Sequence, residues 1–278
     1  MVTYTQTTLA REVVVSGTGL HTGTDVRMVM QPAPAETGIV FHTQDGTIPC
    51  SVAHASPDAA RNTTLRRGEA SLHTVEHVLA ALSGLGIDNA VVALGRAAEP
   101  PVMDGSALPL CHALREAGVR ALEASSRFFE VSRPLFVEDP GRAAAAVLPH
   151  DGFRITVLIG YDHPLVRTQS FDAELTEQSF LDQVAPARTY GFIEEVETLR
   201  KAGLALGGNE DNAVVIYPDR FSTDLRMENE LAAHKALDMI GDLALLGRRV
   251  RGHFIGYRSG HALNARLVRA IMASAAQG

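Results

Sequence analysis

Two short segments, far apart in the chain, carry side chains that could bind a catalytic metal ion. The first ends in Glu76-His77, and the second runs from His234 to Asp238. Residues four apart lie on one face of a helix, so His234 and Asp238 could hold one ion while His77 completes the site. Two histidines and one carboxylate leave a coordination position for water, as in hydrolytic zinc enzymes. Glu76, beside a ligand, could then act as the base.

Each of these side chains also has an ordinary structural explanation. A single histidine on a partly apolar helix is usually a hydrogen-bonded core or surface residue, and for His77 alone this explanation is preferred. His234 and Asp238 could equally form an exposed ion pair. Asp242 extends the same face by one turn, on a helix whose other positions are mainly apolar. Three polar residues on such a helix need a polar environment, and a metal pocket would supply one.

Three further histidines are open to more than one interpretation. His73 precedes His77 by four residues, which is also a helical zinc spacing, so it stays an alternative ligand. His261 lies in a glycine-containing turn before a helix, where a helix cap and an acid directed into a cleft are both open. His21 lies in the glycine-rich stretch 17–23, which lacks the Gly-Lys-Ser/Thr ending of a phosphate loop.

Composition restricts the class of protein. The 278 residues are 46% hydrophobic and 21% charged, which indicates a globular protein of one large or two medium domains. Met1 to Val15 lacks signal-peptide features, and no apolar stretch approaches the roughly 20 residues that span a bilayer, so we expect a cytoplasmic protein without stable membrane insertion. The two cysteines are isolated and should be reduced thiols. A net charge of −7 argues against nucleic acid as a partner.

The pattern of elements favours an α+β fold. Strand signals recur in both halves of the chain, whereas the strongest helical patterns come late in each half. The helix that carries His77 is expected from Leu72 to Leu82, with Ser71 as its N-cap. The strand signals lie at residues 26–30, 90–94, 143–148 and 153–159.

The two halves resemble each other. Each contains a helix, a Leu-Gly pair, a strand and a Gly-x-Ala-Leu turn that opens a second helix. Aligning the two Leu-Gly pairs places His77 on Asp238. We therefore predict an internal duplication: two similar α/β sandwich domains, residues 1–125 and 126–278, with the active site between them. Unrelated topologies in the two halves would contradict this prediction.

Seven motifs occur in an order that resembles the UDP-3-O-acyl-N-acetylglucosamine deacetylases, the zinc enzymes of lipid A biosynthesis. The ordered set is far more specific than any single motif, and the resemblance extends from about Thr5 to Ala275. The motifs are GLHTG (19–23), TVEH (74–77), GLGIDN (84–89), MDGS (103–106), ARTYGF (187–192), HKALDMIGD (234–242) and SGHALN (259–264).

The resemblance implies one zinc ion, held by His77, His234 and Asp238. It also implies that Glu76 is the general base. The family has no ligand that corresponds to His73, which is therefore expected to be structural.

The resemblance assigns further roles near the metal. It implies His261 as the general acid, Asp242 as the group that holds its imidazole, and Thr189 as a hydroxyl that contacts the oxyanion. Lys235 is expected to meet a phosphate or the reaction centre. Tyr190 stands where the family usually has phenylalanine, which adds a hydroxyl near the substrate.

Substrate recognition follows from the resemblance alone. The implied substrate is a UDP-sugar with a 3-hydroxyacyl chain, and the segment near residues 189–215 resembles the family insert that forms an apolar acyl passage. An ordinary amphipathic helix packed on the domain would explain the same segment. The residues expected to bind substrate are Leu20, His21, Tyr190, Phe192, Ile193, Val196, Gly207 and Gly208.

The implied reaction is zinc-dependent hydrolysis of the N-acetyl group of UDP-3-O-(3-hydroxyacyl)-N-acetylglucosamine, which gives UDP-3-O-(3-hydroxyacyl)-glucosamine and acetate. A zinc amidohydrolase with another N-acyl substrate and a non-catalytic nucleotide-sugar or lipid-binding protein are the alternatives. We expect the chain to act as a monomer.

Overall fold

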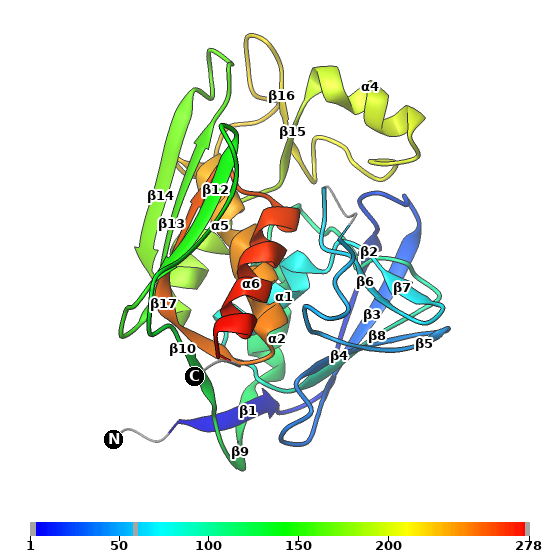
Figure 1. Cartoon of the computed structure of the whole chain (residues 1–278). Helices are drawn as coiled ribbons and strands as arrows, with labels where there is room; N and C mark the ends of the chain where they lie inside the picture. Colours follow the sequence, from blue (N-terminus) through cyan, green and yellow to red (C-terminus); the bar gives the residue numbers. More distant parts are fainter. Residues whose placement is uncertain (1–3, 58–60, 276–278) are drawn as a thin grey trace.

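The computed structural model of the chain describes residues 4–57 and 61–275. Two mixed β-sheets lie on either side of a layer of helices, with the N-terminal sheet on the right and the C-terminal sheet on the left in Figure 1. The helices of this layer are α1 (Glu76–Gly84), α2 (Leu108–Ala117), α5 (Glu230–Leu243) and α6 (His261–Ala275).

The first half of the chain forms a five-stranded sheet in the order β2-β3-β8-β4-β5. In β3, buried and exposed positions alternate, as expected for a sheet with one face on the core. The strands are β2 (Val13–Thr18), β3 (Asp25–Pro32), β4 (Ile39–Thr43), β5 (Gly46–Pro49) and β8 (Ala90–Gly95).

The second half forms a sheet in the order β11-β12-β17-β13-β14, with β10 (Phe128–Glu130) paired to β17. Helix α5 packs on β13 and β14, and α6 packs on β11 and β12. The strands are β11 (Leu135–Asp139), β12 (Ala143–Leu148), β13 (Phe153–Gly160), β14 (Thr168–Glu174) and β17 (Arg249–Tyr257).

The two sheets have the same topology. In each, the first two strands form an antiparallel pair, the third strand is parallel to the last, and the last strand lies at the centre. A helix precedes the central strand and another follows it, so α1 corresponds to α5 and α2 to α6. The prediction of two similar domains in an α+β fold is therefore confirmed.

The remaining elements extend this framework. Strands β15 and β16 pair in parallel and, together with α4, project above the layer of helices in Figure 1. No helix among the described residues is long and apolar enough to cross a membrane. The elements outside the two sheets and the layer of helices are β1 (Thr5–Leu9), β6 (Leu65–Arg67), β7 (Ala70–Leu72), β9 (Val119–Ser125), α3 (Glu177–Ser179), a π-helix (Phe180–Val184), β15 (Tyr190–Phe192), α4 (Ile193–Lys201), β16 (Val214–Ile216) and a 3-10 helix (Ala244–Leu246).

We propose residues 1–125 and 126–278 as the two domains. Ser125 ends β9, which pairs with β1, whereas β10 joins the C-terminal sheet three residues later. The ends of these ranges, residues 1–3 and 276–278, lie outside the described part of the chain.

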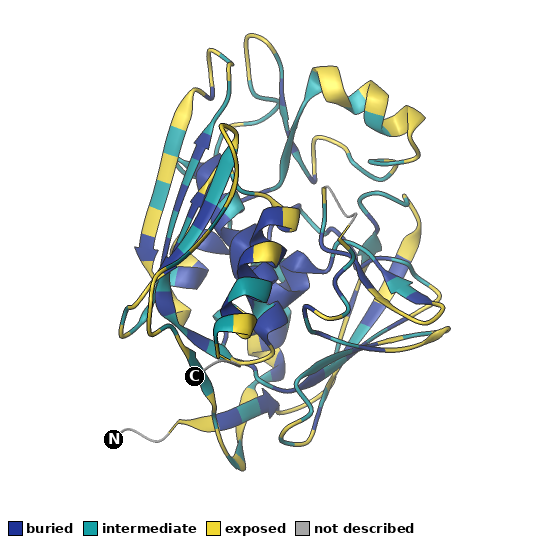
Figure 2. Ribbon diagram, in the orientation of Figure 1, coloured by how far each residue is buried: buried dark blue, intermediate teal, exposed yellow. Residues whose placement is uncertain are grey.

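The core is centred on the contact between α1 and α5, the dark blue helices between the sheets in Figure 2. A Cβ atom at Gly241 would overlap the backbone carbonyl of Glu76, so this position accepts only glycine at the observed helix separation. Ala80 and Ala81 of α1 are fully buried as well. Small residues therefore allow the two backbones to approach closely.

The predicted start of α1 was wrong. The helix begins at Glu76, with Val75 as N-cap, whereas Ser71 and Leu72 belong to strand β7. The cause is Thr74, whose φ of 56° lies in the left-handed region and interrupts any helix that began earlier.

A buried ion pair joins the segment before β15 to the start of α5. The Arg188 guanidinium donates to both carboxylate oxygens of Glu230, at 2.7 and 3.0 Å, and Glu230 is completely buried. The backbone N–H groups of Arg188 and Arg226 donate to the same carboxylate, at 3.0 and 2.7 Å. Every oxygen of this buried charge thus has a partner.

Replacement of Arg188 by methionine is expected to lower the free energy of unfolding by about 3 kcal/mol, because Glu230 would stay buried without its cation. Urea denaturation measures this change. The matched control is Arg154→Met, which breaks an exposed pair with Asp172 and should cost much less. Equal losses in the two variants would contradict the prediction.

The same pair makes stability depend on pH. Burial alone would raise the pKa of Glu230, but the hydrogen bonds and charge of Arg188, with the Arg226 amide, hold it below its ordinary value of 4.5. A carboxyl with a lowered folded pKa contributes stability above its ordinary pKa, and the contribution is lost as pH falls through the folded pKa. The difference in unfolding free energy between wild type and Glu230→Gln should therefore shrink below pH 4.5. A constant difference down to about pH 3 would refute this linkage.

Candidate metal centre and active site

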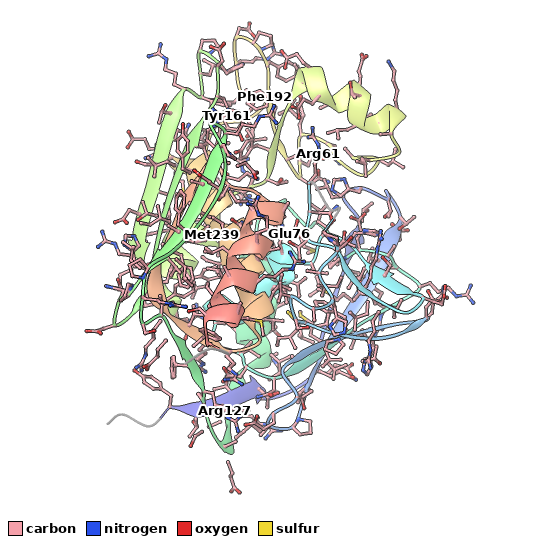
Figure 3. All side chains as sticks on the ribbon, viewed as in Figure 1. Arg61, Glu76, Arg127, Tyr161, Phe192 and Met239 are labelled. Carbon is pink, nitrogen blue, oxygen red and sulfur yellow. The ribbon has the colours of Figure 1, made fainter. Side chains whose placement is uncertain are left out.

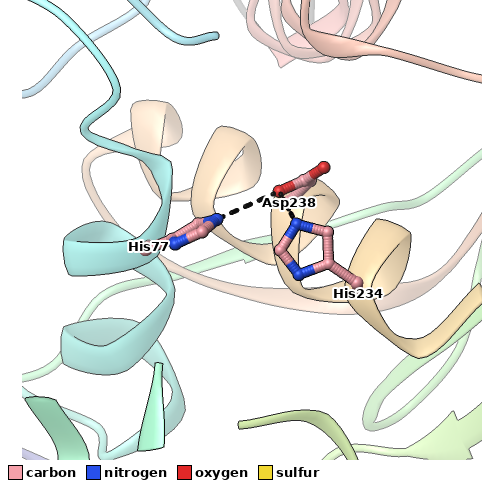
Figure 4. Close-up of side chains that lie close together, drawn as sticks. All are labelled: His77, His234 and Asp238. Carbon is pink, nitrogen blue, oxygen red and sulfur yellow. Dashed lines mark ion pairs between the residues drawn. The ribbon is translucent and has the colours of Figure 1, made fainter. Parts of the chain in front are cut away.

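Three side chains from α1 and α5 converge in a group that could hold a metal ion. One ligand atom from each of His77, His234 and Asp238 lies within 4.8 Å of the others, and all three residues are buried. Asp238 Oδ1 is 3.6 Å from Nε2 of His77 and 3.4 Å from Nε2 of His234 (Figure 4). Two imidazoles and a carboxylate directed at one point form a donor set that suits zinc.

The environment of His234 favours the form that binds a metal. Its Nδ1 donates to the backbone carbonyl of Ala187 at 3.0 Å, which leaves the Nε2 lone pair directed at Asp238. Burial, together with the positive charge of Lys235, lowers the pKa of His234 to about 4, although Asp238 opposes this shift. His234 is therefore neutral at physiological pH, as a metal ligand must be.

Asp238 is held in its ionised form. Burial would raise its pKa, but the nearby Lys235 ammonium keeps that pKa well below the usual range. Lys235 Nζ donates to Oδ2 at 2.7 Å, so Oδ1 is left facing the two histidines. The Asp238 carboxylate thus presents Oδ1 to the two histidines and Oδ2 to the Lys235 ammonium.

Glu76 lies beside this group, at the first position of α1. It is buried, and its Oε2 accepts a hydrogen bond from the backbone N–H of Thr63 at 2.9 Å. Burial raises the pKa of its carboxyl, while the charges of His261 and His77 lower it in part. Its other oxygen, Oε1, lies 3.9 Å from His261 Nε2. Two groups that can exchange protons therefore lie on either side of a narrow gap.

His261, the first residue of α6, is held by a buried carboxylate. Its Nδ1 lies 3.0 Å from Oδ2 of Asp242, which also accepts from Asn264 Nδ2 at 2.8 Å and, through Oδ1, from the Thr63 hydroxyl. Burial lowers the pKa of His261, but the carboxylates of Asp242, Glu76 and Asp238 outweigh burial and raise it to about 10. The imidazole is thus cationic, with Nε2 directed at Glu76.

A cavity of about 710 Å³ opens from the metal group toward β15 and α4. Four of the residues that line it, Arg61, Glu76, Tyr161 and Phe192, are labelled in Figure 3. Of the residues predicted for the site, the following line this cavity: Leu20, His21, Glu76, His77, Thr189, Tyr190, Phe192, Ile193, Val196, Gly208, His234, Lys235, Asp238 and His261.

Two predicted residues lie just outside the cavity wall. Asp242 is fully buried behind His261, and Gly207 packs against the backbone of Gly19. His73 is also outside; its Nδ1 shares a hydrogen bond with the Thr64 hydroxyl at 3.0 Å. Because α1 begins only at Glu76, His73 is not on the helix, and the helical zinc spacing with His77 does not arise.

Sequence comparison extends these findings to known proteins. A family model described as UDP-3-O-acyl N-acetylglycosamine deacetylase matches residues 6–273. The chain is also 43% identical, over 276 residues, to the UDP-3-O-acyl-N-acetylglucosamine deacetylase of Pseudomonas entomophila (strain L48), with 96% of this chain and 90% of that protein covered. The chain belongs to the UDP-3-O-acyl N-acetylglycosamine deacetylase family. The resemblance inferred from the seven motifs is therefore confirmed.

This deacetylase-family chain departs from the expected phenylalanine at Tyr190. The Tyr190 hydroxyl lies 2.9 Å from the Tyr161 hydroxyl, and the Lys235 ammonium lies 5.4 Å from the centre of the Tyr190 ring. Burial raises the pKa of Tyr190 well above its usual value, so the phenol stays neutral. The additional hydroxyl thus has its own partner within the cavity wall.

Sequence reasoning missed two residues of this deacetylase-family site, Asn264 and Thr63. Asn264 follows His261 by three residues on α6, a helical spacing that could have identified it as a partner of Asp242. Thr63 had no such signal, because it comes from a loop and contacts Glu76 through its backbone and Asp242 through its side chain.

Replacement of Asp242 by asparagine is expected to lower the pKa of His261 from about 10 toward its ordinary value of 6.5, because a neutral amide cannot offset burial. NMR titration of the metal-stripped protein measures this pKa. Asn264→Ala is the control, since it removes one donor to Asp242 and leaves the carboxylate charge in place. An unchanged pKa in Asp242→Asn would contradict the role given to that charge.

Proposed function

We infer that the protein hydrolyses the N-acetyl group of UDP-3-O-(3-hydroxyacyl)-N-acetylglucosamine, a step of lipid A biosynthesis, and releases acetate. Membership of the deacetylase family gives the reaction class. The observation that carries the proposal at atomic level is that His261 Nε2 lies 3.9 Å from Glu76 Oε1 and 4.0 Å from Asp238 Oδ2, beside the group of His77, His234 and Asp238.

We propose one zinc ion with His77, His234 and Asp238 as its protein ligands. The donor set supports this, because both imidazole Nε2 atoms and one carboxylate oxygen face a common point. When bound, zinc supplies a Lewis acid that lowers the pKa of a water molecule toward about 7 and polarises a carbonyl group. The protein supplies the orientation of the donors through Ala187 and Lys235.

Glu76 is proposed as the general base. Its Oε1 accepts the proton of the attacking water as the new carbon–oxygen bond forms at the acetamide carbonyl. The Thr63 amide holds Oε2 and therefore leaves Oε1 as the oxygen that faces the reaction. Burial raises the pKa of Glu76 and makes its carboxylate a better proton acceptor.

Thr189 is proposed to stabilise the negative charge on the carbonyl oxygen. Its backbone is fixed on both sides, since its N–H donates to Gly105 at 2.8 Å and its carbonyl accepts from Val214 at 2.8 Å. A preorganised hydroxyl at this position would contribute roughly 3 kcal/mol to transition-state stabilisation. Lys235, in the same wall, is proposed to contact a phosphate or the reaction centre.

His261 is proposed as the general acid. As the carbon–nitrogen bond breaks, Nε2 donates its proton to the departing nitrogen, which leaves as an amine. A cationic imidazole is needed because amines leave poorly as anions. Asp242 maintains that cation and fixes Nδ1, so Nε2 is the donor.

The apolar part of the cavity is proposed to hold the 3-hydroxyacyl chain. Phe192, Ile193, Val196 and Leu199 come from β15 and α4, and Leu20 also lines the cavity. His21, Tyr190, Gly207 and Gly208 are proposed to contribute to the same substrate site. One chain provides all these residues, which supports action as a monomer.

The first test is amine release from the UDP-3-O-(3-hydroxyacyl)-N-acetylglucosamine substrate by metal-stripped protein, before and after addition of one equivalent of zinc. We expect release only after zinc is restored, because the donor set has no substitute for the ion. Asp238→Ala should fail to retain zinc under the same conditions. Absence of release with zinc restored would refute the deacetylase proposal.

Glu76→Gln is expected to reduce kcat about 100-fold or more, because the amide cannot accept the proton of water. Its zinc content should stay equal to that of wild type, as measured by atomic emission. Glu69→Gln is the matched control, since Glu69 is an exposed carboxyl in the turn between β6 and β7. Full activity of Glu76→Gln would eliminate Glu76 as the base.

Two other outcomes would change the assignment. Equal turnover of substrates with and without the 3-hydroxyacyl chain would indicate a zinc amidohydrolase with another N-acyl substrate. Tight binding of the substrate without amine release would indicate a non-catalytic binding protein.

A further inference from the structure

Glu99 is a completely buried carboxyl that has no part in the mechanism above. Within residues 4–57 and 61–275, it makes no ion pair with arginine, lysine or histidine. A buried carboxylate is costly unless hydrogen bonds compensate for the lost water. The donors that supply those bonds therefore show what Glu99 holds in place.

One carboxylate oxygen holds the turn that contains Leu20. Oε1 accepts from the backbone N–H of His21 at 2.9 Å and from that of Thr22 at 2.6 Å. A Cβ atom at Gly19 would overlap this same oxygen, so the turn closes directly around the carboxylate. Two adjacent amides that converge on one acceptor give the turn a single conformation.

The turn at residues 19–22 also holds the loop that follows α4. Its carbonyls at Leu20 and His21 accept from the backbone N–H groups of Gly207 and Leu206, at 3.0 and 3.2 Å. The His21 ring accepts from the Ala205 amide at 3.3 Å. The turn at residues 19–22 and the loop at residues 205–208, which border the cavity, are thus fixed to each other through backbone contacts.

The other carboxylate oxygen reaches the start of α1. Oε2 accepts from the Thr74 hydroxyl at 3.3 Å, and Thr74 is the residue with a left-handed φ of 56°. Glu76 and His77 follow two and three residues later. One buried side chain therefore contacts both the wall of the apolar cavity and the strained turn that begins the metal-binding helix.

We propose that Glu99 is a positioning residue with two separate roles: one carboxylate oxygen fixes the wall of the acyl passage and so determines selectivity for long acyl chains, and the other holds the start of α1. The proposal rests on the proposed deacetylase function. Its physical basis is that Leu20 and the 205–208 loop can present an apolar wall only while both backbones are held.

The experiment compares turnover of the 3-hydroxyacyl substrate with that of its 3-O-acetyl analogue, which does not reach the passage. In Glu99→Ala, three partly buried donors lose their acceptor, and the ratio of kcat/KM values, long chain over acetyl, should fall about tenfold through KM of the long-chain substrate. Glu99→Gln keeps an oxygen for the two amides and an NH₂ group toward Thr74, so it should retain the ratio. An unchanged ratio in folded Glu99→Ala would overturn the proposal.

Thr74→Val separates the two contacts of the carboxyl. It removes only the hydroxyl that Oε2 accepts from, so it should lower kcat for both substrates equally and leave the ratio as in wild type. A fall in the ratio in this variant would show that the turn at Leu20 is not the element that sets selectivity, and the proposal would fail.

If Glu99→Ala does not fold, Gly19→Ala provides a second test of the same contact. The added methyl group displaces the carboxylate from the turn, so the ratio should fall as in Glu99→Ala. Glu69→Ala, which removes an exposed carboxyl, is the control and should leave the ratio unchanged. A wild-type ratio in Gly19→Ala would count against the proposal.

Hydrogen exchange tests the positioning role without any substrate. In Glu99→Ala, or in Gly19→Ala if Glu99→Ala does not fold, the amides of His21, Thr22, Leu206 and Gly207 should exchange at least about tenfold faster than in wild type. In the Glu69→Ala control they should exchange at the wild-type rate. If the wild-type protein released no amine, the deacetylase proposal would fail while this measurement still decided the role of Glu99. Unchanged exchange at these amides would overturn that role.

Discussion

The contact between α1 and α5 at Gly241 is the constraint on which the site depends. A side chain at this position would overlap the Glu76 carbonyl, so glycine sets the distance between the two helices. That distance brings His77 within 3.6 Å of Asp238 across the boundary of the two similar halves. Because the helices are equivalent elements of a duplicated unit, the metal group forms between copies, and neither half contains all three donors.

Buried charge, balanced by specific partners, determines the chemistry around that contact. Lys235 neutralises the outer oxygen of Asp238, and Asp242 neutralises His261. The low-dielectric surroundings strengthen each of these interactions and penalise any group left without a partner. The same hydrogen bonds therefore fix the conformation of the site and the orientation of the groups that are proposed to transfer protons. The packing of the helices fixes where those bonds form.

Much of the site was predictable because it follows local periodicity. The four-residue spacing of His234, Asp238 and Asp242 places all three on one helix face, and the repeated Leu-Gly pairs indicated the duplication that the sheet topology confirms. The failures have a different origin. The start of α1 depends on the left-handed conformation of Thr74, and threonine carries no strong preference for that region. Thr63 acts in part through its backbone amide, which every residue type except proline possesses.

The sequence by itself determined the residue types, their helical spacing and the order of motifs, which together identified the family and a zinc-type donor set. Tertiary structure alone decided that His77 faces His234 and Asp238, while His73 forms a hydrogen bond with Thr64. It also decided that Glu99 reaches the turn at His21 across 78 residues of chain. The reason is physical: helical spacing is set by hydrogen bonds between near neighbours, whereas these contacts depend on how distant backbones pack.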